Sequence, residues 1–275
     1  MQIIILGSGS PLPDAERAGP ATLVRTGIGD LLFDCGRGVL MRAAAAASGA
    51  GALRGLFLTH LHSDHTTDLN DIITSRWVMS FQPNPLAVFG PPGTTGLVRA
   101  TEAMLELDIG YRLAHHADLR WRPSAEVGEA EHGAVLEEGA VRVTAAPTDH
   151  APVRPTVGYR IEEGATSVVI AGDTVPCAGL DELCAGADVL VHTVVRRDLI
   201  EPIGLPRLTD VLDYHSSLED AARTAARNGV STLVLTHLVP APQPGTEDDW
   251  VARAKEHFSG TVVLARDLLS LDVAP

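Results

Sequence analysis

The sequence has 275 residues, 45% of them hydrophobic and 20% charged, which is the composition of a folded chain and excludes a predominantly disordered one. With 35 acidic and 21 basic residues the formal net charge is −14, so the average field of the molecule repels nucleic acids and anionic membranes. Three cysteines, Cys35, Cys177 and Cys184, are too few for a disulfide framework and favour a reducing compartment, so we expect a cytoplasmic location. The N-terminal residues lack the basic segment of a signal peptide, and no apolar run is long enough to span a membrane.

Short β-branched runs separated by helical patterns follow one another along the chain. The predicted strands are residues 3–6, 21–24, 31–33, 53–58, 86–89, 141–145, 156–161, 167–170, 189–191, 232–235 and 261–264. The predicted helices are 39–47, a stretch after Thr66, 95–107, 217–228 and 246–258. This mixture predicts an α/β protein in which helices cover sheets, and not an all-β chain.

Local signals mark some boundaries more sharply than others. Ser217 and Asp220 have the spacing of a capping box, and Asn228-Gly229 is typical of a helix end. Residues 108–131 mix charges, histidines and tryptophans without a clear period, so we expect an irregular, lid-like excursion there. No repeat divides the chain, and a single domain over residues 1–275 is the simpler interpretation.

The strongest chemical signal is the segment His60-Leu61-His62-Ser63-Asp64-His65, which follows a predicted buried strand. If the extended backbone persists, His60 and His62 point the same way, because alternate side chains share a face. Imidazoles with a carboxylate and no nearby cysteine favour zinc or a similar divalent ion. The alternative, a polar loop that binds no metal, is disfavoured by the density of ligand types.

This string resembles the signature of the metallo-β-lactamase superfamily, and the resemblance extends over nearly the whole chain. Further matching motifs follow in order: Asp34-Cys35-Gly36, Thr148-Asp149-His150, Gly172-Asp173-Thr174 and Thr236-His237. The resemblance implies a four-layer αββα sandwich with two divalent metal ions. By the family pattern the first ion would be held by His60, His62 and His150, the second by Asp64, His65 and His237, with Asp173 between them. Asp34 would orient a ligand without binding metal.

Taken singly, the later motifs have simpler explanations. A lone histidine after a strand, such as His150 or His237, is usually an ordinary polar residue, and Asp173 could stabilise its own turn.

A two-ion site, most simply a zinc site, would lower the pKa of a bridging water so that hydroxide forms near neutrality. The expected activity is therefore hydrolysis, with Asp64 and His215 as candidate catalytic residues.

His215 carries the finer prediction. The segment Asp213-Tyr214-His215-Ser216-Ser217 resembles the His-Ser-Thr element of ribonuclease Z and the related zinc arylsulfatases and phosphodiesterases. The resemblance implies that His215 donates a proton or stabilises an oxyanion. The alternative is that His215 only bonds backbone at a helix start. His192 lies where ribonuclease Z carries a His-Glu-Ala element; we expect it beside the ligands or the substrate, although the glutamate is missing here.

Two departures from ribonuclease Z concern its RNA substrate. The early glycine-rich loop carries Asp14 and Glu16 where the nuclease has a basic run, and only 23 positions separate His150 from Asp173, too few for the long arm that grips tRNA. We therefore expect a small phosphodiester or sulfate ester as substrate, with no membrane partner and nucleic acid disfavoured. A lactonase or thioesterase, a tRNA 3′-processing ribonuclease Z and a non-catalytic metal sensor stay open. The resemblance also implies a homodimer.

Four further residues have undecided roles. His115 and His116 could reach the site from the lid-like excursion, or be ordinary exposed loop residues. Arg196 and Arg197 follow a predicted strand and could steer an anionic substrate, or be a solvated pair.

Overall fold

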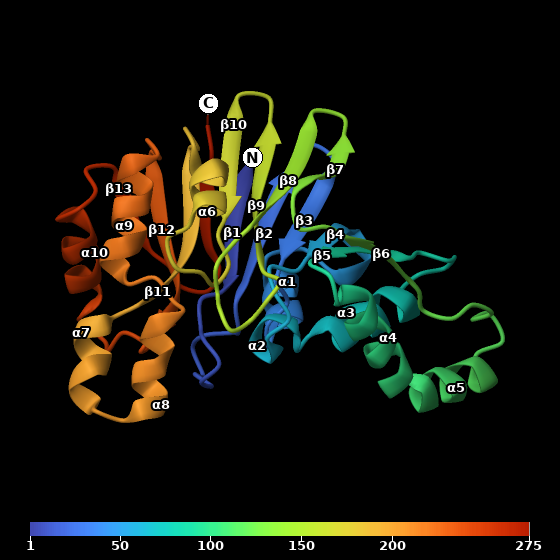
Figure 1. The fold of residues 1–275 in the computed structure, drawn as a ribbon. Helices are drawn as coiled ribbons and strands as arrows, with labels where there is room; N and C mark the ends of the chain where they lie inside the picture. Colours follow the sequence, from blue (N-terminus) through green and yellow to red (C-terminus); the bar gives the residue numbers. More distant parts are fainter. Residues whose placement is uncertain (275) are drawn as a thin grey trace.

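The predicted β-branched runs form two seven-stranded β-sheets that lie face to face in the computed structural model, which describes residues 1–274. The first sheet has the order β14-β1-β2-β3-β4-β5-β6 and the second β13-β12-β11-β10-β9-β8-β7. Helices cover the outer face of each sheet (Figure 1). The prediction of an α/β four-layer sandwich is confirmed.

The first sheet consists of β1 (Gln2–Gly7), β2 (Ala21–Thr26), β3 (Gly29–Phe33), β4 (Leu53–Phe57), β5 (Leu86–Gly90), β6 (Ala125–Glu129) and β14 (Leu269–Asp272). On or beside its outer face lie α1 (Val39–Ala45), α2 (Ser63–Thr66), α3 (Leu69–Val78), α4 (Thr94–Met104), α5 (Glu106–His115) and the short 3-10 helix η1 (Ala50–Ala52). Leucines of β3 and β4 form an apolar cluster with α1, α3 and α4, including Leu32, Leu56 and Ile72.

The second sheet consists of β7 (Gly133–Glu138), β8 (Val141–Pro147), β9 (Val157–Glu163), β10 (Thr166–Ile170), β11 (Val189–Val195), β12 (Thr232–Val239) and β13 (Thr261–Leu264). Its helices are α6 (Ala178–Cys184), α9 (Leu218–Arg227) and α10 (Glu247–Lys255). Alanines of α9, such as Ala222, pack closely on β11 and β12. Between β11 and α9 the chain forms α7 (Arg197–Ile200), α8 (Pro206–Thr209) and the 3-10 turns η2 (Glu201–Ile203) and η3 (Asp210–Asp213).

An aromatic and aliphatic core joins the inner faces of the two sheets. The rings of Phe33 and Phe57 stack with centroids 4.8 Å apart, and Phe57 stacks in the same way on Phe89. Tyr159 reaches across from the second sheet and donates its hydroxyl to the Leu58 carbonyl at 2.7 Å. This core holds the two sheets in register at the point where β4 ends and the histidine-rich segment begins.

The strands β3 to β6 are parallel to one another, and so are the strands β10 to β13. Carboxyl ends of parallel strands meet at one edge of a sheet, which is where α/β proteins place polar sites. The segments after β4 and β10 and the end of β12 carry His60, Asp173 and His237, so the topology brings these distant residues to one edge of the sandwich.

The predictions for single elements were mostly right, and the capping box of α9 is confirmed, since Ser217 Oγ accepts the Asp220 amide and the Asp220 carboxylate bonds back. The prediction that 108–131 is irregular was wrong, because this segment contains most of α5 and all of β6. α5 buries only Ile109 and is otherwise partly or fully exposed, and β6 is a partly exposed edge strand. Strands β7 and β14 were also missed. A lid role for the segment and the single-domain boundary remain predictions.

No helix among residues 1–274 combines the length and the apolar character that crossing a membrane requires.

Candidate metal centre

Two residues of the site have unusual backbone conformations. Asp34, directly after β3, and His237, within β12, both have positive φ angles, 59° and 50°. Non-glycine residues adopt this region rarely, and such positions are typical of functional sites. Gly172, φ 65°, lies so close to Thr59 that a Cβ atom would come within 2.7 Å of it. A side chain at position 172 would therefore displace the turn that carries Asp173.

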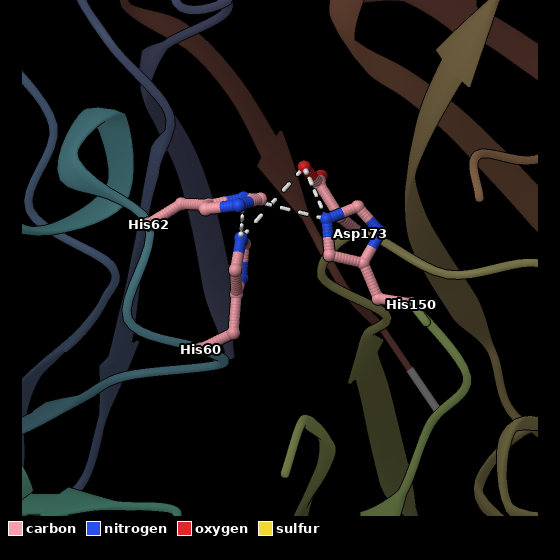
Figure 2. Close-up of side chains that lie close together, drawn as sticks. All are labelled: His60, His62, His150 and Asp173. Carbon is pink, nitrogen blue, oxygen red and sulfur yellow. Dashed lines mark hydrogen bonds and ion pairs between the residues drawn. The ribbon is translucent and has the colours of Figure 1, made fainter. Parts of the chain in front are cut away.

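Four side chains form a first group at the carboxyl edge: His60, His62, His150 and Asp173 (Figure 2). The Nε2 atom of His60 lies 3.0 Å from His62 Nδ1, which is 3.4 Å from His150 Nε2. Oδ2 of Asp173 lies 3.9 Å from the Nε2 atoms of both His60 and His150. The four donor atoms lie within 4.8 Å of one another, as an ion held by all four would require.

A second group of side chains lies on the other side of Asp173. It consists of Asp64, His65 and His237, whose donor atoms also lie within 4.8 Å of one another. Oδ2 of Asp64 is 3.6 Å from His65 Nε2 and 3.3 Å from His237 Nε2. Oδ2 of Asp173 is 3.4 Å and 3.5 Å from the same two nitrogens. One oxygen of Asp173 thus faces both groups, the position in which a carboxylate can bridge two ions.

The histidine tautomers test whether this cluster fits a cation. His150 donates its Nδ1–H to the Tyr214 carbonyl at 2.7 Å, and His65 donates its Nδ1–H to Asp34 at 2.8 Å. His60 Nδ1 faces the Thr59 hydroxyl at 3.1 Å. With their outer Nδ1 atoms protonated, His65 and His150 present Nε2 lone pairs toward Oδ2 of Asp173.

Converging lone pairs in a buried site repel one another unless a positive charge lies between them. His65 Nε2 and Asp173 Oδ1 are buried atoms without a hydrogen-bond partner among the described residues. Histidine ligands in metal sites donate their outer N–H to a carboxylate or carbonyl, as His65 and His150 do here. The residues present therefore fit divalent ions.

Burial favours the neutral, ligand form of the three imidazoles in the first group. Burial lowers the pKa of His60 well below its usual value, lowers the pKa of His62, and lowers the pKa of His150 to about 4. Although burial opposes it, His237 and His65 hold the pKa of Asp173 well below its usual value. The first group thus has the neutral imidazoles that metal coordination needs, whereas in the second group Asp173 and Asp34 outweigh burial and raise the pKa of His65 well above its usual value.

His215 lies beside this cluster. Its Nε2 atom is 3.2 Å from Asp173 Oδ2, and its Nδ1 atom is 2.9 Å from the Val211 carbonyl oxygen. The side chain is 7% exposed, and its ring lies against that of His150 with centroids 4.8 Å apart. The structure thus brings His215 together with both groups, and the helix that follows is capped by Ser217 and not by His215.

His192 is not brought to the cluster. Along β11, Val189 and Val191 face the other sheet, whereas Leu190 and Val194 belong to the cluster of α6 and α9. By alternation His192 also faces the helices. Its Nδ1–H is donated to the Thr193 carbonyl at 2.7 Å, and burial lowers its pKa to about 4. Sequence position alone suggested a site residue, but the strand turns this side chain away.

The arginine pair and the histidine pair with undecided roles do not belong to either ligand group. Arg196 is buried, pairs with Asp198 and Asp249 at 2.8 Å, and lies over the Trp250 ring. Its charge is therefore used inside the protein and not for steering. Arg197 is exposed and pairs with Glu201. His115 and His116 are exposed at the end of α5, which projects away from the sheets (Figure 1).

Some contributors to the site carried no signal that the sequence interpretation used. Thr59 precedes His60 and donates its hydroxyl to the Asp34 carboxylate at 2.9 Å. A hydroxyl residue between a strand and a histidine could have been noticed. The carbonyls of Tyr214 and Val211 could not, because every residue has a carbonyl and only the fold selects which one faces a histidine.

Comparison with known proteins agrees with this geometry. Residues 30–238 match the family model described as the β-lactamase superfamily domain. The chain belongs to the metallo-β-lactamase superfamily. It is 55% identical over 275 residues to a protein named ribonuclease Z from Mycolicibacterium paratuberculosis, covering 99% of this chain and 98% of that one. A protein of the same name from Mycobacterium bovis is 53% identical over 277 residues, covering 100% and 99%.

Solved structures show the same superfamily fold. The metallo-β-lactamase fold protein YhfI from Bacillus subtilis superposes with a TM-score of 0.74 at 24% identity, covering 98% of both chains. The short form of human tRNase Z gives a TM-score of 0.73 at 22% identity, covering 100% of both chains. The predicted resemblance is confirmed. The relatives' name favours the ribonuclease Z alternative over the small-ester substrate expected from the sequence, and with it a nucleic-acid partner that the sequence analysis disfavoured.

Proposed function

We propose that this protein is a metal-dependent phosphodiesterase that cleaves RNA, of the ribonuclease Z type, acting at the 3′ ends of precursor tRNA. The observation that carries the proposal is the position of His215 Nε2, 3.2 Å from the Asp173 oxygen that faces both ligand groups. A histidine that is not needed as a ligand is thereby available to the scissile group. The relatives at 53–55% identity, named ribonuclease Z, support the same reaction class.

We assign two ions, preferably zinc, to the two groups of side chains. One would be held by His60, His62 and His150, the other by Asp64, His65 and His237, with Asp173 shared. When bound, divalent ions of this kind polarise a phosphoryl oxygen and lower the pKa of water. Imidazole and carboxylate donors without thiolates suit zinc.

The protein's own residues supply orientation and a proton. Asp34 and the Tyr214 carbonyl hold His65 and His150 with their inner nitrogens toward Asp173, where they would bind the ions. Asp64 would hold the second ion with His65 and His237 and would accept a hydrogen bond from the attacking water. His215, protonated on both ring nitrogens, would donate the Nε2 proton to the oxygen that leaves phosphorus and keep Nδ1–H on the Val211 carbonyl, because a ribose oxygen leaves poorly without a proton.

A small phosphodiester is the second candidate substrate, and two observations favour it. Only β9, β10 and their short connections lie between His150 and Asp173, so no tRNA-gripping arm is inserted there. Asp14 and Glu16 are exposed on the early loop, where they would repel an RNA backbone.

The deciding experiment is a turnover screen on zinc-loaded protein, with metal content measured by elemental analysis. The substrates are a precursor tRNA with a 3′ trailer, bis(p-nitrophenyl) phosphate, p-nitrophenyl sulfate and a lactone. Cleavage of the precursor at the trailer junction supports the proposal. Hydrolysis of the small phosphodiester without RNA cleavage would favour the second candidate, and sulfate or lactone turnover alone would overturn both.

His215→Ala and the matched variant His132→Ala control for the site. His132 is exposed and pairs only with Glu182, so its loss should leave turnover unchanged. His215→Ala should keep the metal content and lose about 10²-fold or more in turnover of the precursor. Equal activities of the two variants would contradict the role of His215.

A further inference from the structure

The segment between β11 and α9, residues 196–213, ends immediately before Tyr214 and His215. It contains α7, α8 and the two 3-10 turns, and it lies at the end of the sandwich that carries α2, the helix of Asp64 and His65 (Figure 1). The segment thus flanks the metal centre without supplying a candidate ligand.

One contact joins this segment to the chemistry. The Val211 carbonyl oxygen lies 2.9 Å from His215 Nδ1. A carbonyl is only an acceptor, so Nδ1 must carry a proton in this arrangement. The other nitrogen, Nε2, is then the one that faces Asp173, and the ring cannot flip without breaking the bond to Val211.

The residue that occupies the place of the missing glutamate has another partner. Thr193 follows His192, and its hydroxyl is donated to the Gly172 carbonyl at 2.9 Å. It therefore supports the turn that carries Asp173 and does not hold His215. The Val211 carbonyl therefore holds His215 in a protein that lacks the glutamate of the His-Glu-Ala element.

Several interactions fix the position of Val211. The neighbouring Leu212 is 3% exposed and packs against Val195 and Ile200 in a small apolar cluster of its own. Arg197 donates from Nη2 to the Leu212 carbonyl at 3.1 Å.

The start of the segment is equally well held. Arg196 is buried and forms ion pairs with Asp198 and with Asp249 of α10. Its guanidinium lies 5.1 Å from the centre of the Trp250 ring. Both ends of the segment are therefore anchored to the second sheet and its helices.

We propose that residues 196–213 are a positioning element for His215, in which the Val211 carbonyl holds the ring so that Nε2 points at the leaving oxygen of the substrate. The proposal rests on the proposed phosphodiesterase function. Val211, Leu212 and Arg197 are positioning residues, since they act only through His215. Their importance should be visible for substrates whose leaving group needs a proton and small for substrates whose leaving group does not.

The test compares two esters of one nucleotide, thymidine 5′-phosphate esterified with p-nitrophenol or with phenol. Phenolate is the poorer leaving group and gains more from proton donation. Leu212→Ala loosens the segment, and Leu180→Ala removes an equally buried leucine from the core beneath α6. We expect Leu212→Ala to slow hydrolysis of the phenyl ester about tenfold and hydrolysis of the p-nitrophenyl ester about twofold or less. Both effects are a fraction of the 10²–10⁴-fold rate gain that is typical of a general acid.

Leu180→Ala should reduce the rates of hydrolysis of both esters by the same factor, because it destabilises the fold without changing the position of His215. Arg197→Gln should act like Leu212→Ala, and Arg197→Lys should restore part of the selectivity. If Leu212→Ala slows both esters equally, the positioning role is overturned. If wild-type protein hydrolyses neither ester nor the precursor tRNA, the proposed function itself fails.

A second measurement does not depend on turnover. Long-range ¹H–¹⁵N spectra of the zinc-loaded full-length protein, labelled on histidine, report which ring nitrogen carries the proton. At a pH where the ring has a single proton, we expect it on Nδ1 of His215, with the signal assigned by its loss in His215→Ala. Leu212→Ala should mix the two tautomers. A singly protonated wild-type ring that carries its proton on Nε2 would overturn the proposal, whatever the activities.

Discussion

The Asp34 carboxylate accepts the Nδ1–H of His65 at 2.8 Å with one oxygen and the Thr59 amide at 2.8 Å with the other. It joins the loop after β3 to the loop after β4 and turns the inner nitrogen of His65 toward Asp173. Asp34 is itself 4% exposed and has a positive φ angle, so the fold maintains this contact at a cost in backbone strain.

Asp34→Asn tests this contact, because asparagine tolerates positive φ and keeps the side-chain shape. Loss of the negative charge should weaken zinc binding about 10- to 100-fold, the usual effect of removing a partner behind a histidine ligand. Competition with a chromogenic chelator measures the affinity. Asp272→Asn, at an exposed strand position, is the matched control. Unchanged zinc affinity in Asp34→Asn would contradict the orienting role.

Removal of metal should lower the stability of the whole fold. Lone pairs of His60, His62 and His150 converge within hydrogen-bond distances, and an ion relieves their repulsion. An ion at 1,000 times its dissociation constant stabilises the native state by about 4 kcal/mol. Thermal unfolding with zinc and with excess chelator gives the comparison, and Asp173→Asn should show a much smaller difference. Identical melting temperatures with zinc and chelator would argue against a site in these residues.

His192 should make the metal-free protein less stable in acid. Burial lowers its pKa to about 4, whereas in the unfolded chain it is about 6.5. The unfolded state therefore binds a proton first, and stability is lost as the pH falls from about 6.5 to about 4. The full effect is about 3 kcal/mol, from about 1.4 kcal/mol per pKa unit.

Urea unfolding of chelator-treated protein at several pH values measures this slope. His192→Asn should flatten the slope between pH 6.5 and 4 by about one bound proton. His132→Asn, at an exposed position, should leave it unchanged. An unaltered slope in His192→Asn would show that His192 is not buried in its neutral form.

The helix cap that follows His215 should contribute measurably to stability. Ser217 Oγ accepts the Asp220 amide at 3.1 Å, and the Asp220 carboxylate accepts the Ser217 amide and hydroxyl. Ser217→Ala should therefore lower the free energy of unfolding by about 1 kcal/mol. Ser217→Thr should retain most of it. A loss in turnover much larger than the loss in stability would mean that the cap also fixes His215.

Much of this site was predictable because it is written in short-range pattern. Four potential ligands within His60–His65 identify a metal motif without any fold, and the strand-end positions of His150, Asp173 and His237 follow from β-branched runs. The capping box of α9 is equally local, since its two partners are three residues apart.

Other features depended on contacts between distant residues. α5 and β6 escaped prediction because they bury few side chains. His192 was misjudged as a neighbour of the site because its direction depends on the register of β11 between α9 and the opposite sheet.

The sequence by itself determined the superfamily, the α/β layering and the identity of the side chains that could bind metal, because these are carried by residue type and spacing. Only the tertiary structure decided how those side chains are held. The Val211 carbonyl that orients His215 and the Tyr214 carbonyl that orients His150 are main-chain atoms common to every residue. Which carbonyl faces which histidine is decided when the two sheets pack and the segment 196–213 is anchored beside them.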